Sequence, residues 1–358
     1  MQALKKAYKL ERHFPLKVLF LLVSTTLTYG QDVEFCQSVD FKVCSWYILS
    51  TTQILQNATD NIIVSPSNIQ ALLQRPQAIG LRFGMGEEQE GQPENKNPFV
   101  GVNAIFTESK ENLNNIDYLE MFYNCSIQEK STKNPLISTL DDITISFDGI
   151  ENLKVLVLNI FSFKETLQIN FKYTLNITYY TRPDSIIVPA VETTENLRYH
   201  DSQILDAKIL ELPYSNGFSM YILLPHTKQG VNEMINNLGY EQLKRIEWMM
   251  EERRVNVVLP TFRTSYMMNM REHIQEISEH RFDVDFSTTF NVETNKTNFY
   301  QFTALQFNGS GEAVEEDYSK TRSNKYVKFH VDRPFLFYIA EKDRIVCIGK
   351  VVNPMQYK

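Results

Sequence analysis

The chain closes with the stretch Val327–Pro354, which reads VKFHVDRPFLFYIAEKDRIVCIGKVVNP. Apolar residues fill most of this stretch, and they predict strands at the end of a domain that mixes strands and helices. Cys347 lies inside the run IVCIG and is expected to be a small buried apolar residue rather than a functional thiol.

The segments before this stretch extend the same pattern. Asn216-Gly217 is a turn signal between two apolar segments and predicts a β-hairpin. The remaining expected elements are strands at 99–107, 154–163, 255–262 and 299–308, helices at 33–55, 112–124 and 231–252, and a short strand at 61–64 before a restarting helix. The strand at 154–163 is apolar enough to be buried on both faces. Residues 84–98 predict an exposed loop, and the order of elements predicts an α+β fold rather than alternating strands and helices.

The chain begins with a pattern typical of a secretory leader. Residues 1–30 contain a basic start, the apolar run PLKVLFLLV and small residues near Gly30, so we expect a mature chain from Gln31. A membrane anchor is the alternative, but the apolar run is short for a span, and no later segment is apolar enough. The sequence therefore predicts a secreted, extracellular protein without a membrane partner. A formal net charge of −7 disfavours nucleic acid as a partner.

Sequons and cysteines fit an extracellular compartment. The sequons predict N-linked glycans at Asn57, Asn124, Asn176, Asn295 and Asn308. Cys36, Cys44, Cys125 and Cys347 allow up to two disulfides, whose pairing the sequence leaves open.

Motifs for catalysis or metal binding are missing from the sequence. It has no nucleophile-elbow, Walker, H-E-x-x-H or C-x-x-C motif. His273, Glu276 and His280 can share one face of a helix, but no further ligand lies near them in sequence, so a solvated amphipathic helix is the preferred interpretation. We expect no enzyme, no cofactor and no metal.

Several segments together resemble the serpin family of serine protease inhibitors. They are NIIVSPSNIQALL, KVLVLNIFSF with Asn159, AKILELPYSNGFSMYILLPHTKQGVNEM, VNVVLPTFRTSYMMNMREHI and the C-terminal stretch quoted first. Their order and spacing match over almost the whole mature chain. The resemblance implies one monomeric domain, residues 31–358, with three β-sheets and about eight helices. It also implies a reactive loop at about residues 309–328 that a protease cleaves and that then inserts into a sheet as a new strand.

The hinge of this loop departs from the inhibitory family pattern. Gly311 matches the family's hinge glycine, and small residues are expected after it. Instead the chain continues with Glu312, Ala313, Val314, Glu315 and Glu316, followed by Asp317 and Tyr318. Alternate residues of an inserted strand point into the sheet's interior, and burying an unpaired carboxylate there costs several kcal/mol. The loop is also a few residues shorter than inhibitory loops.

Lys320, Arg322 and Lys325 are the candidates for the residue that a protease would cleave after. Each suits a trypsin-like protease, while solvation of an exposed loop explains the same charges. The region where the sheet opens is matched by Ser65, Asn68, Asn159 and Gln301, with Gln301 in place of the family's usual histidine. Short intervals at 73–99 and 130–150 predict that the family's helices C, D and F are shortened or lost.

These departures predict a non-inhibitory serpin that is a protease substrate, a binding protein or an extracellular signalling protein. The alternative is an inhibitor of an extracellular trypsin-like serine protease. A small-molecule carrier on the same scaffold has no support beyond aromatic residues, which are more often core. The divergent loop also resembles insect seminal-fluid serpins of the male accessory gland.

Overall fold

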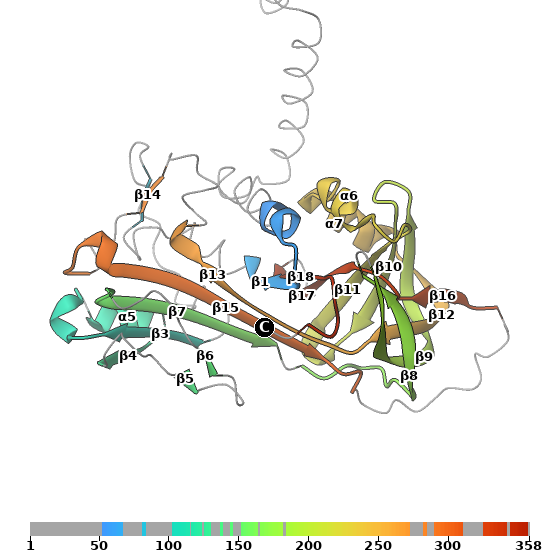
Figure 1. Ribbon diagram of the computed structural model, residues 1–358, viewed down its shortest axis with the longest axis horizontal. Coiled ribbons are helices and arrows are strands. Elements are labelled where there is room, and N and C mark those ends of the chain that lie inside the picture. Colours follow the sequence, from blue (N-terminus) through green and yellow to red (C-terminus); the bar gives the residue numbers. More distant parts are fainter. Residues whose placement is uncertain are drawn as a thin grey trace, which may run out of the picture. The chain divides into compact units, whose positions relative to one another are not determined.

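Strands make up most of the computed structural model, which is shown in Figure 1. The described residues are 52–66, 81–83, 102–114, 116–123, 125–129, 137–138, 144–145, 152–163, 165–181, 184–272, 282–284, 290–310, 325–341 and 344–356. All of them belong to one compact unit, Tyr47–Lys358. The expected leader, Cys36, Cys44, the 84–98 loop and the His273–His280 segment lie outside the described residues.

One sheet has nine strands in the order β1-β18-β17-β11-β10-β9-β12-β16, with β8 paired to β9. Their bounds are β1 Ile62–Val64, β8 Tyr173–Tyr180, β9 Ser185–Ser202, β10 Ala207–Pro213, β11 Phe218–Pro225, β12 Glu251–Pro260, β16 Val327–His330, β17 Phe335–Glu341 and β18 Arg344–Val351. The C-terminal stretch thus supplies β16, β17 and β18, as its apolar runs predict. Cys347 is fully buried and is a free cysteine, which confirms its expected role.

The predicted hairpin between β10 and β11 is confirmed. Asn216 and Gly217 have φ of 61° and 80°, a left-handed conformation that glycine adopts without strain and asparagine tolerates. Tyr214 N–H donates to the carbonyl oxygen of Phe218 at 2.8 Å and closes the turn.

β9 is an 18-residue strand that the sequence patterning did not predict. Its neighbours change along its length: residues 185–192 pair with β8, 190–199 with β12, and 199–202 with β10. Because each part has a different environment, the burial of its side chains does not alternate regularly.

A second sheet has five strands in the order β13-β15-β7-β3-β4. The bounds are β3 Val102–Thr107, β4 Cys125–Glu129, β7 Val155–Phe163, β13 Phe262–Asn269 and β15 Thr297–Phe307. β7 and β15 run parallel, side by side, and are the long green and orange strands of Figure 1. The expected burial of β7 on both faces is confirmed, since only Val157 and Ser162 are partly exposed.

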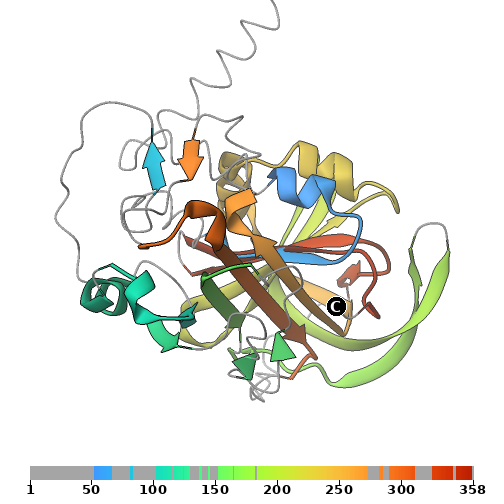
Figure 2. The ribbon, with the colours of Figure 1, turned by 60° about the vertical axis from the view of Figure 1, so that its left-hand side comes forward.

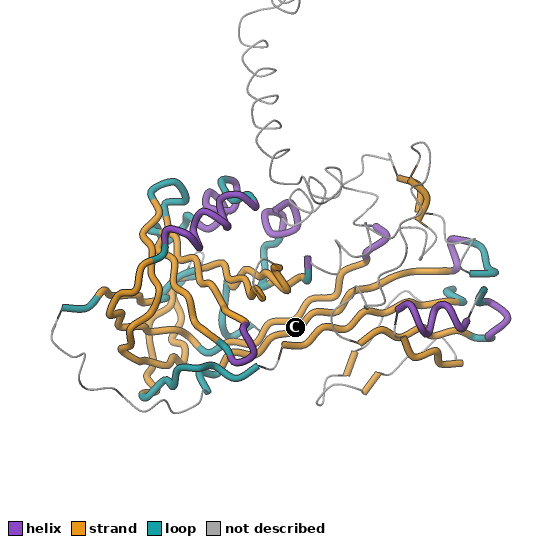
Figure 3. Tube along the Cα trace, turned by 180° about the vertical axis from the view of Figure 1, so that it is seen from behind, coloured by secondary structure: helices purple, strands orange, loops and turns teal. Residues whose placement is uncertain are grey.

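Helices are short, and one predicted helix is divided. The segment expected to form a single helix over 231–252 forms α6 (Val231–Asn236) and α7 (Tyr240–Met249), because Gly239 has an extended conformation and β12 already begins at Glu251. The predicted helix at 112–124 appears as α5 (Ile116–Tyr123). Residues 52–57 are helical. Figure 3 shows these helices in purple beside the strands. Within the described part of the chain, every helix is too short or too polar to cross a membrane.

The smaller elements complete the described structure. They are the strand pairs β2 (Leu81–Phe83) with β14 (Phe282–Val284) and β5 (Ile137–Ser138) with β6 (Thr144–Ile145), and the 3-10 turns η2 (Lys110–Asn112), η3 (Ser215–Gly217) and η4 (Thr294–Lys296). Most of 73–99 and 130–150 lies outside the described residues, so the loss of helices C, D and F stays a prediction.

A shared core joins the two large sheets. Phe262 of β13 stacks on Phe307 of β15, with ring centroids 5.7 Å apart, and packs against Phe335 and Phe337 of β17 at 5.6 Å. Close approach is required at Gly349, where a Cβ atom would lie 2.6 Å from the Phe337 ring. The C-terminal stretch therefore forms one wall of this core.

One charged side chain is buried at the edge of the nine-stranded sheet. Lys350 is 1% exposed, and its Nζ donates to the carbonyl oxygens of Leu55 and Ala58 at the end of the 52–57 helix. A cation there is favourable for carbonyl groups that lack helical partners. Burial nevertheless lowers the pKa of Lys350 from 10.5 to about 8.

Replacement of Lys350 by methionine should change the pH dependence of stability. Because the folded-state pKa lies below the unfolded value, this lysine's contribution is present above pH 10.5 and is lost as pH falls through about 8. The wild type should therefore gain up to about 3 kcal/mol in unfolding free energy over that window relative to Lys350→Met. Urea unfolding of both proteins from pH 7.5 to 10 measures the difference, and parallel curves would contradict the assignment.

Candidate functional site

A row of buried amide side chains crosses the five-stranded sheet. The strand register places Gln301 of β15 opposite Asn159 of β7, and Asn159 opposite Asn103 of β3. Gln301 and Asn159 are each 1% exposed and Asn103 is 6% exposed. Since side chains at paired positions point to the same face, the three amides form one polar row within an apolar layer.

Each amide of this row takes part in hydrogen bonds. Asn159 Nδ2 donates to Asn103 Oδ1 at 2.7 Å. Gln301 makes two contacts with the backbone of Ser65: its Oε1 accepts from the N–H at 3.1 Å, and its Nε2 donates to the carbonyl oxygen at 3.3 Å. A glutamine amide can do both at once without ionising.

Ser65 links the amide row to the other large sheet. It directly follows β1, which pairs with β18, and its Oγ donates to the carbonyl oxygen of Val346 in β18 at 2.8 Å. Ser65 is fully buried. One residue is therefore bonded both to the five-stranded sheet through Gln301 and to the nine-stranded sheet through Val346.

The structure brings together three of the residues predicted for the sheet-opening region, Ser65, Asn159 and Gln301. Asn68 lies outside the described residues. Sequence reasoning missed Asn103, although it had the same signal as Asn159, a lone amide inside an apolar strand. It also missed Val346, because this residue takes part through its backbone carbonyl oxygen, and the identity of a side chain does not indicate such a contact.

Two described ends flank the expected reactive loop. β15 ends at Phe307, and the chain then turns at Gly309, which has a φ of 74° and where a Cβ atom would lie 2.8 Å from Val191 Cγ2. On the far side the description resumes at Lys325, which is exposed. The predicted hinge, Gly311–Glu316, and the scissile candidates Lys320 and Arg322 lie outside the described residues.

The strand after the loop is fastened by a side-chain network. β16 runs parallel to β12 from Val327 to His330. His330 Nε2 lies 2.7 Å from Asn256 Oδ1, and Asn256 Nδ2 donates to Glu192 Oε1 at 2.8 Å. An amide oxygen can only accept a hydrogen bond, so His330 Nε2 donates to Asn256 Oδ1. Burial and the nearby Lys328 lower the pKa of His330, which favours the neutral ring.

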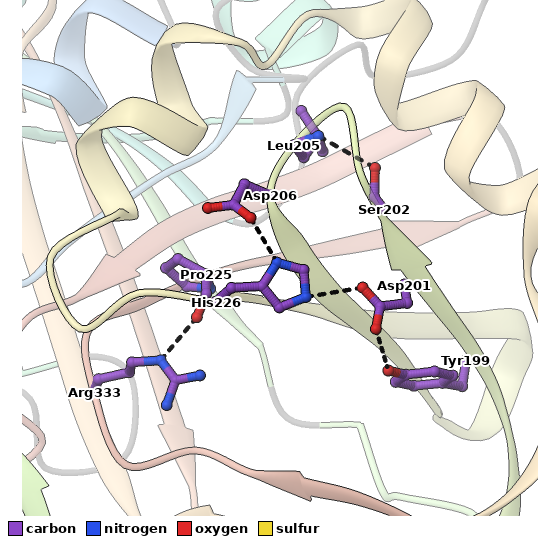
Figure 4. Close-up of polar contacts among 8 residues, drawn as sticks. All are labelled: Tyr199, Asp201, Ser202, Leu205, Asp206, Pro225, His226 and Arg333. Atoms are coloured by element: carbon purple, nitrogen blue, oxygen red, sulfur yellow. Dashed lines mark hydrogen bonds and ion pairs between the residues drawn. The ribbon is translucent and has the colours of Figure 1, made fainter.

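A histidine and carboxylate cluster, drawn in Figure 4, lies at the turn between β9 and β10 and the end of β11. His226 Nδ1 lies 2.8 Å from Asp206 and its Nε2 lies 2.8 Å from Asp201. Ser202, the nearby hydroxyl, accepts from Leu205 N–H instead of contacting the ring. Both ring nitrogens are therefore used by carboxylates, and the cluster fastens the β9–β10 turn to the end of β11 rather than activating a nucleophile.

Metal ligation has no support among the described residues, where no group of three or more His, Cys, Asp or Glu side chains could hold an ion. The described cysteines, Cys125 and Cys347, are both buried and free. Burial raises the pKa of Cys125 to about 11, so its thiol stays protonated at neutral pH.

Comparison with protein families decides the assignment. The family model described as serpin (serine protease inhibitor) matches residues 126–354. The chain is a member of the serpin family. The matched residues include β7 to β13 and β15 to β18, and therefore the strands on either side of the loop and the C-terminal stretch.

Individual serpins match at low identity. Serine protease inhibitor 2 of Anopheles gambiae is 26% identical over 233 residues, which cover 58% of this chain and 56% of the relative. Serpin B13 of Homo sapiens is 24% identical over 277 residues, covering 67% of this chain and 69% of the relative. The chain thus spans little more than half the length of the mosquito relative.

Solved serpin structures share the fold over most of the chain. Native protease nexin-1 with heparin has a TM-score of 0.68 at 19% identity and covers 87% of this chain and 98% of that chain. Serpin48 of the insect Tenebrio molitor has a TM-score of 0.64 at 18% identity and covers 88% and 98%. At these identities the likeness shows the fold alone, so the activity of this serpin is a separate question.

Four of the five predicted glycosylation sites lie among the described residues, and all four are exposed. Asn57, Asn176, Asn295 and Asn308 are exposed, and Asn124 lies outside the described residues. Asn57 ends the 52–57 helix, Asn295 lies in η4, Asn308 follows β15, and Asn176 lies in the middle of β8.

Replacement of Gln301 by leucine should destabilise this serpin by about 2–4 kcal/mol, because buried polar groups lose hydrogen bonds that water cannot replace. The matched control is Gln306→Leu, the same change at an exposed position of the same strand, which should stay within about 0.5 kcal/mol of wild type. Chemical unfolding measures both. Equal effects would show that the contact of Gln301 with Ser65 does not stabilise the fold.

Proposed function

We propose that this serpin is secreted and does not inhibit proteases, and that its reactive loop is a protease substrate or a binding segment. The observation that carries the proposal is the environment between β7 and β15, where an inserting loop would have to enter. Those strands are paired directly, from Thr297 opposite Val155 to Leu305 opposite Phe163.

Both faces of this strand pair are buried and largely apolar. On one face Phe161, Phe163 and Leu305 belong to the core shared by the two large sheets. On the other face Leu158, Ile160, Phe302 and Ala304 form a separate buried cluster. An inserted strand would therefore place its odd and even side chains into two apolar layers.

The hinge sequence conflicts with both layers. In one register Glu312 and Glu316 would enter the layer toward the core, and in the other register Glu315 and Asp317 would do so. The remaining carboxylates would then face the opposite apolar layer. Each unpaired buried carboxylate costs several kcal/mol or takes up a proton, so insertion loses much of its driving force.

The alternative function is inhibition of an extracellular trypsin-like serine protease. Lys320, Arg322 and Lys325 favour it, because a basic residue at the cleaved bond suits an acidic specificity pocket. The same residues equally make the loop a good substrate, so they do not decide between the two functions. The charged hinge does favour the non-inhibitory one.

The extracellular location is part of the proposal. It is supported by the leader-like pattern of residues 1–30 and by exposed sequons such as Asn57 and Asn295. The similarity to serine protease inhibitor 2 of Anopheles gambiae supports an insect serpin, and a role in seminal fluid from the male accessory gland belongs to the same proposal.

Incubation with trypsin-like proteases tests the proposal directly. We expect denaturing gels to show a loop-cleaved serpin and protease at its uncomplexed size, and an activity assay to show undiminished protease activity, because a loop that does not insert releases the protease after hydrolysis. A covalent serpin–protease complex that survives denaturation would contradict the proposal and establish the inhibitory alternative.

Repair of the hinge should change the response to cleavage. In the variant Glu312→Thr, Val314→Ala, Glu315→Ala, Glu316→Ala and Asp317→Ala, small uncharged side chains replace the hinge residues that would enter either apolar layer, so loop cleavage should raise the thermal midpoint, while the wild-type midpoint should stay nearly constant. The matched control is Glu251→Thr and Glu252→Ala at exposed positions of β12. A large cleavage-induced rise in the wild type would show that the charged hinge does insert.

A further inference from the structure

β8 is an outer strand of the nine-stranded sheet. Among the described strands it pairs with β9 and with no other. It runs antiparallel to β9 in an unbroken register, from Tyr173 opposite Glu192 to Tyr180 opposite Ser185. One of its edges therefore carries backbone groups that no described strand covers.

The backbone contacts of Tyr180 and Pro189 show which residues of β8 point their backbone groups to that open edge. Tyr180 N–H donates to the carbonyl oxygen of Asp332 at 2.7 Å, so it points away from β9. Successive residues of a strand point their backbone groups to opposite sides, so Thr174, Asn176 and Thr178 point the same way as Tyr180. Pro189, opposite Asn176, confirms this parity, because its carbonyl accepts from Thr261 N–H at 3.0 Å on the other side of β9.

Between Thr174 and Thr178 the open edge lacks the sequence features that protect natural edge strands against strand addition. Natural edge strands are interrupted by lysine, proline or a bulge. The segment from Thr174 to Thr178 reads TLNIT, with no charge, no proline and an unbroken register. Threonine and isoleucine favour strands, and the side chains of Thr174, Asn176 and Thr178 are exposed.

The sequon Asn176-Ile177-Thr178 lies in the middle of this edge. The other described sequon asparagines lie at a helix end, in a 3-10 turn and in the segment after β15, and not within a strand. We propose that Asn176 carries an N-linked glycan, and that this glycan protects the open edge of β8 against pairing with a strand of a second copy of this chain.

A glycan on Asn176 would block the approach of a further strand to β8. An added strand would lie about 4.8 Å from β8, with its backbone opposite Thr174, Asn176 and Thr178. A branched sugar on the middle residue occupies the space through which that strand and its side chains must approach. Figure 2 shows the hairpin of β8 and β9 in yellow-green. The inference rests on the secretory route proposed above, because only that route attaches N-linked glycans.

The test uses the full chain secreted from eukaryotic cells. Peptide mass spectrometry reports whether Asn176 is occupied, and size-exclusion chromatography with light scattering reports the oligomeric state. We expect an occupied Asn176 and a monomer for wild type, and a several-fold larger dimer and oligomer fraction for Asn176→Gln. Asn57→Gln is the matched control, since it removes another exposed sequon and should stay monomeric.

Two further measurements separate edge pairing from misfolding. Asn176→Lys also removes the glycan but places a charge on the edge, so it should stay monomeric. Trimming the glycans of the folded wild type with an endoglycosidase, which leaves one sugar on each asparagine and adds no charge, should raise the oligomer fraction without any folding step.

Failure of the inference is distinguishable from failure of its premise. If Asn57 and Asn295 are occupied while Asn176 is not, or if Asn176→Gln is as monomeric as Asn57→Gln, the inference is wrong and the secretory route stands. If no sequon is occupied, the secretory premise is wrong and the inference falls with it.

Discussion

The parallel pairing of β7 with β15 is the constraint on which the rest of this serpin depends. It closes the five-stranded sheet, aligns Gln301 with Asn159, and leaves an apolar layer on each face. Through Gln301 and Ser65 the same pairing is connected to β1 and β18 of the other sheet. Any rearrangement that separates β7 from β15 must therefore disturb buried hydrogen bonds and two apolar layers together.

This arrangement explains why family membership and inhibition are separate questions here. The fold supplies the sheet and both anchors of the loop, Gly309 after β15 and β16 beside β12. Insertion also requires a hinge whose side chains fit between apolar layers. The described hydrophobic clusters on the two faces consist of apolar side chains, and a protein interior accepts an ion only with a partner, so burying the hinge carboxylates there is costly.

Glutamine at position 301 makes the hydrogen bonds between β15 and Ser65 independent of pH. Its amide contacts both the N–H and the carbonyl oxygen of Ser65, and neither contact depends on a protonation step. A histidine ring, which the family usually has at this place, changes its hydrogen-bonding pattern when it titrates near neutral pH. The contact between Gln301 and Ser65 is thus insensitive to pH in the range where a histidine contact would respond.

The sequence by itself determined the strands with strong local signals and, through their order, the family. Apolar runs placed β7, β15 and β17, and Asn216-Gly217 placed the β10–β11 turn, because these signals depend on neighbouring residues alone. The division of one expected helix into α6 and α7 and the length of β9 escaped it, since Gly239 alone is a weak helix breaker and β9 changes neighbours along its length. Only the tertiary structure decided that Asn103 joins Asn159, that Gln301 holds Ser65, and that Asn176 lies on an open edge. Those facts depend on strand register, which is fixed by the packing of residues far apart in the chain.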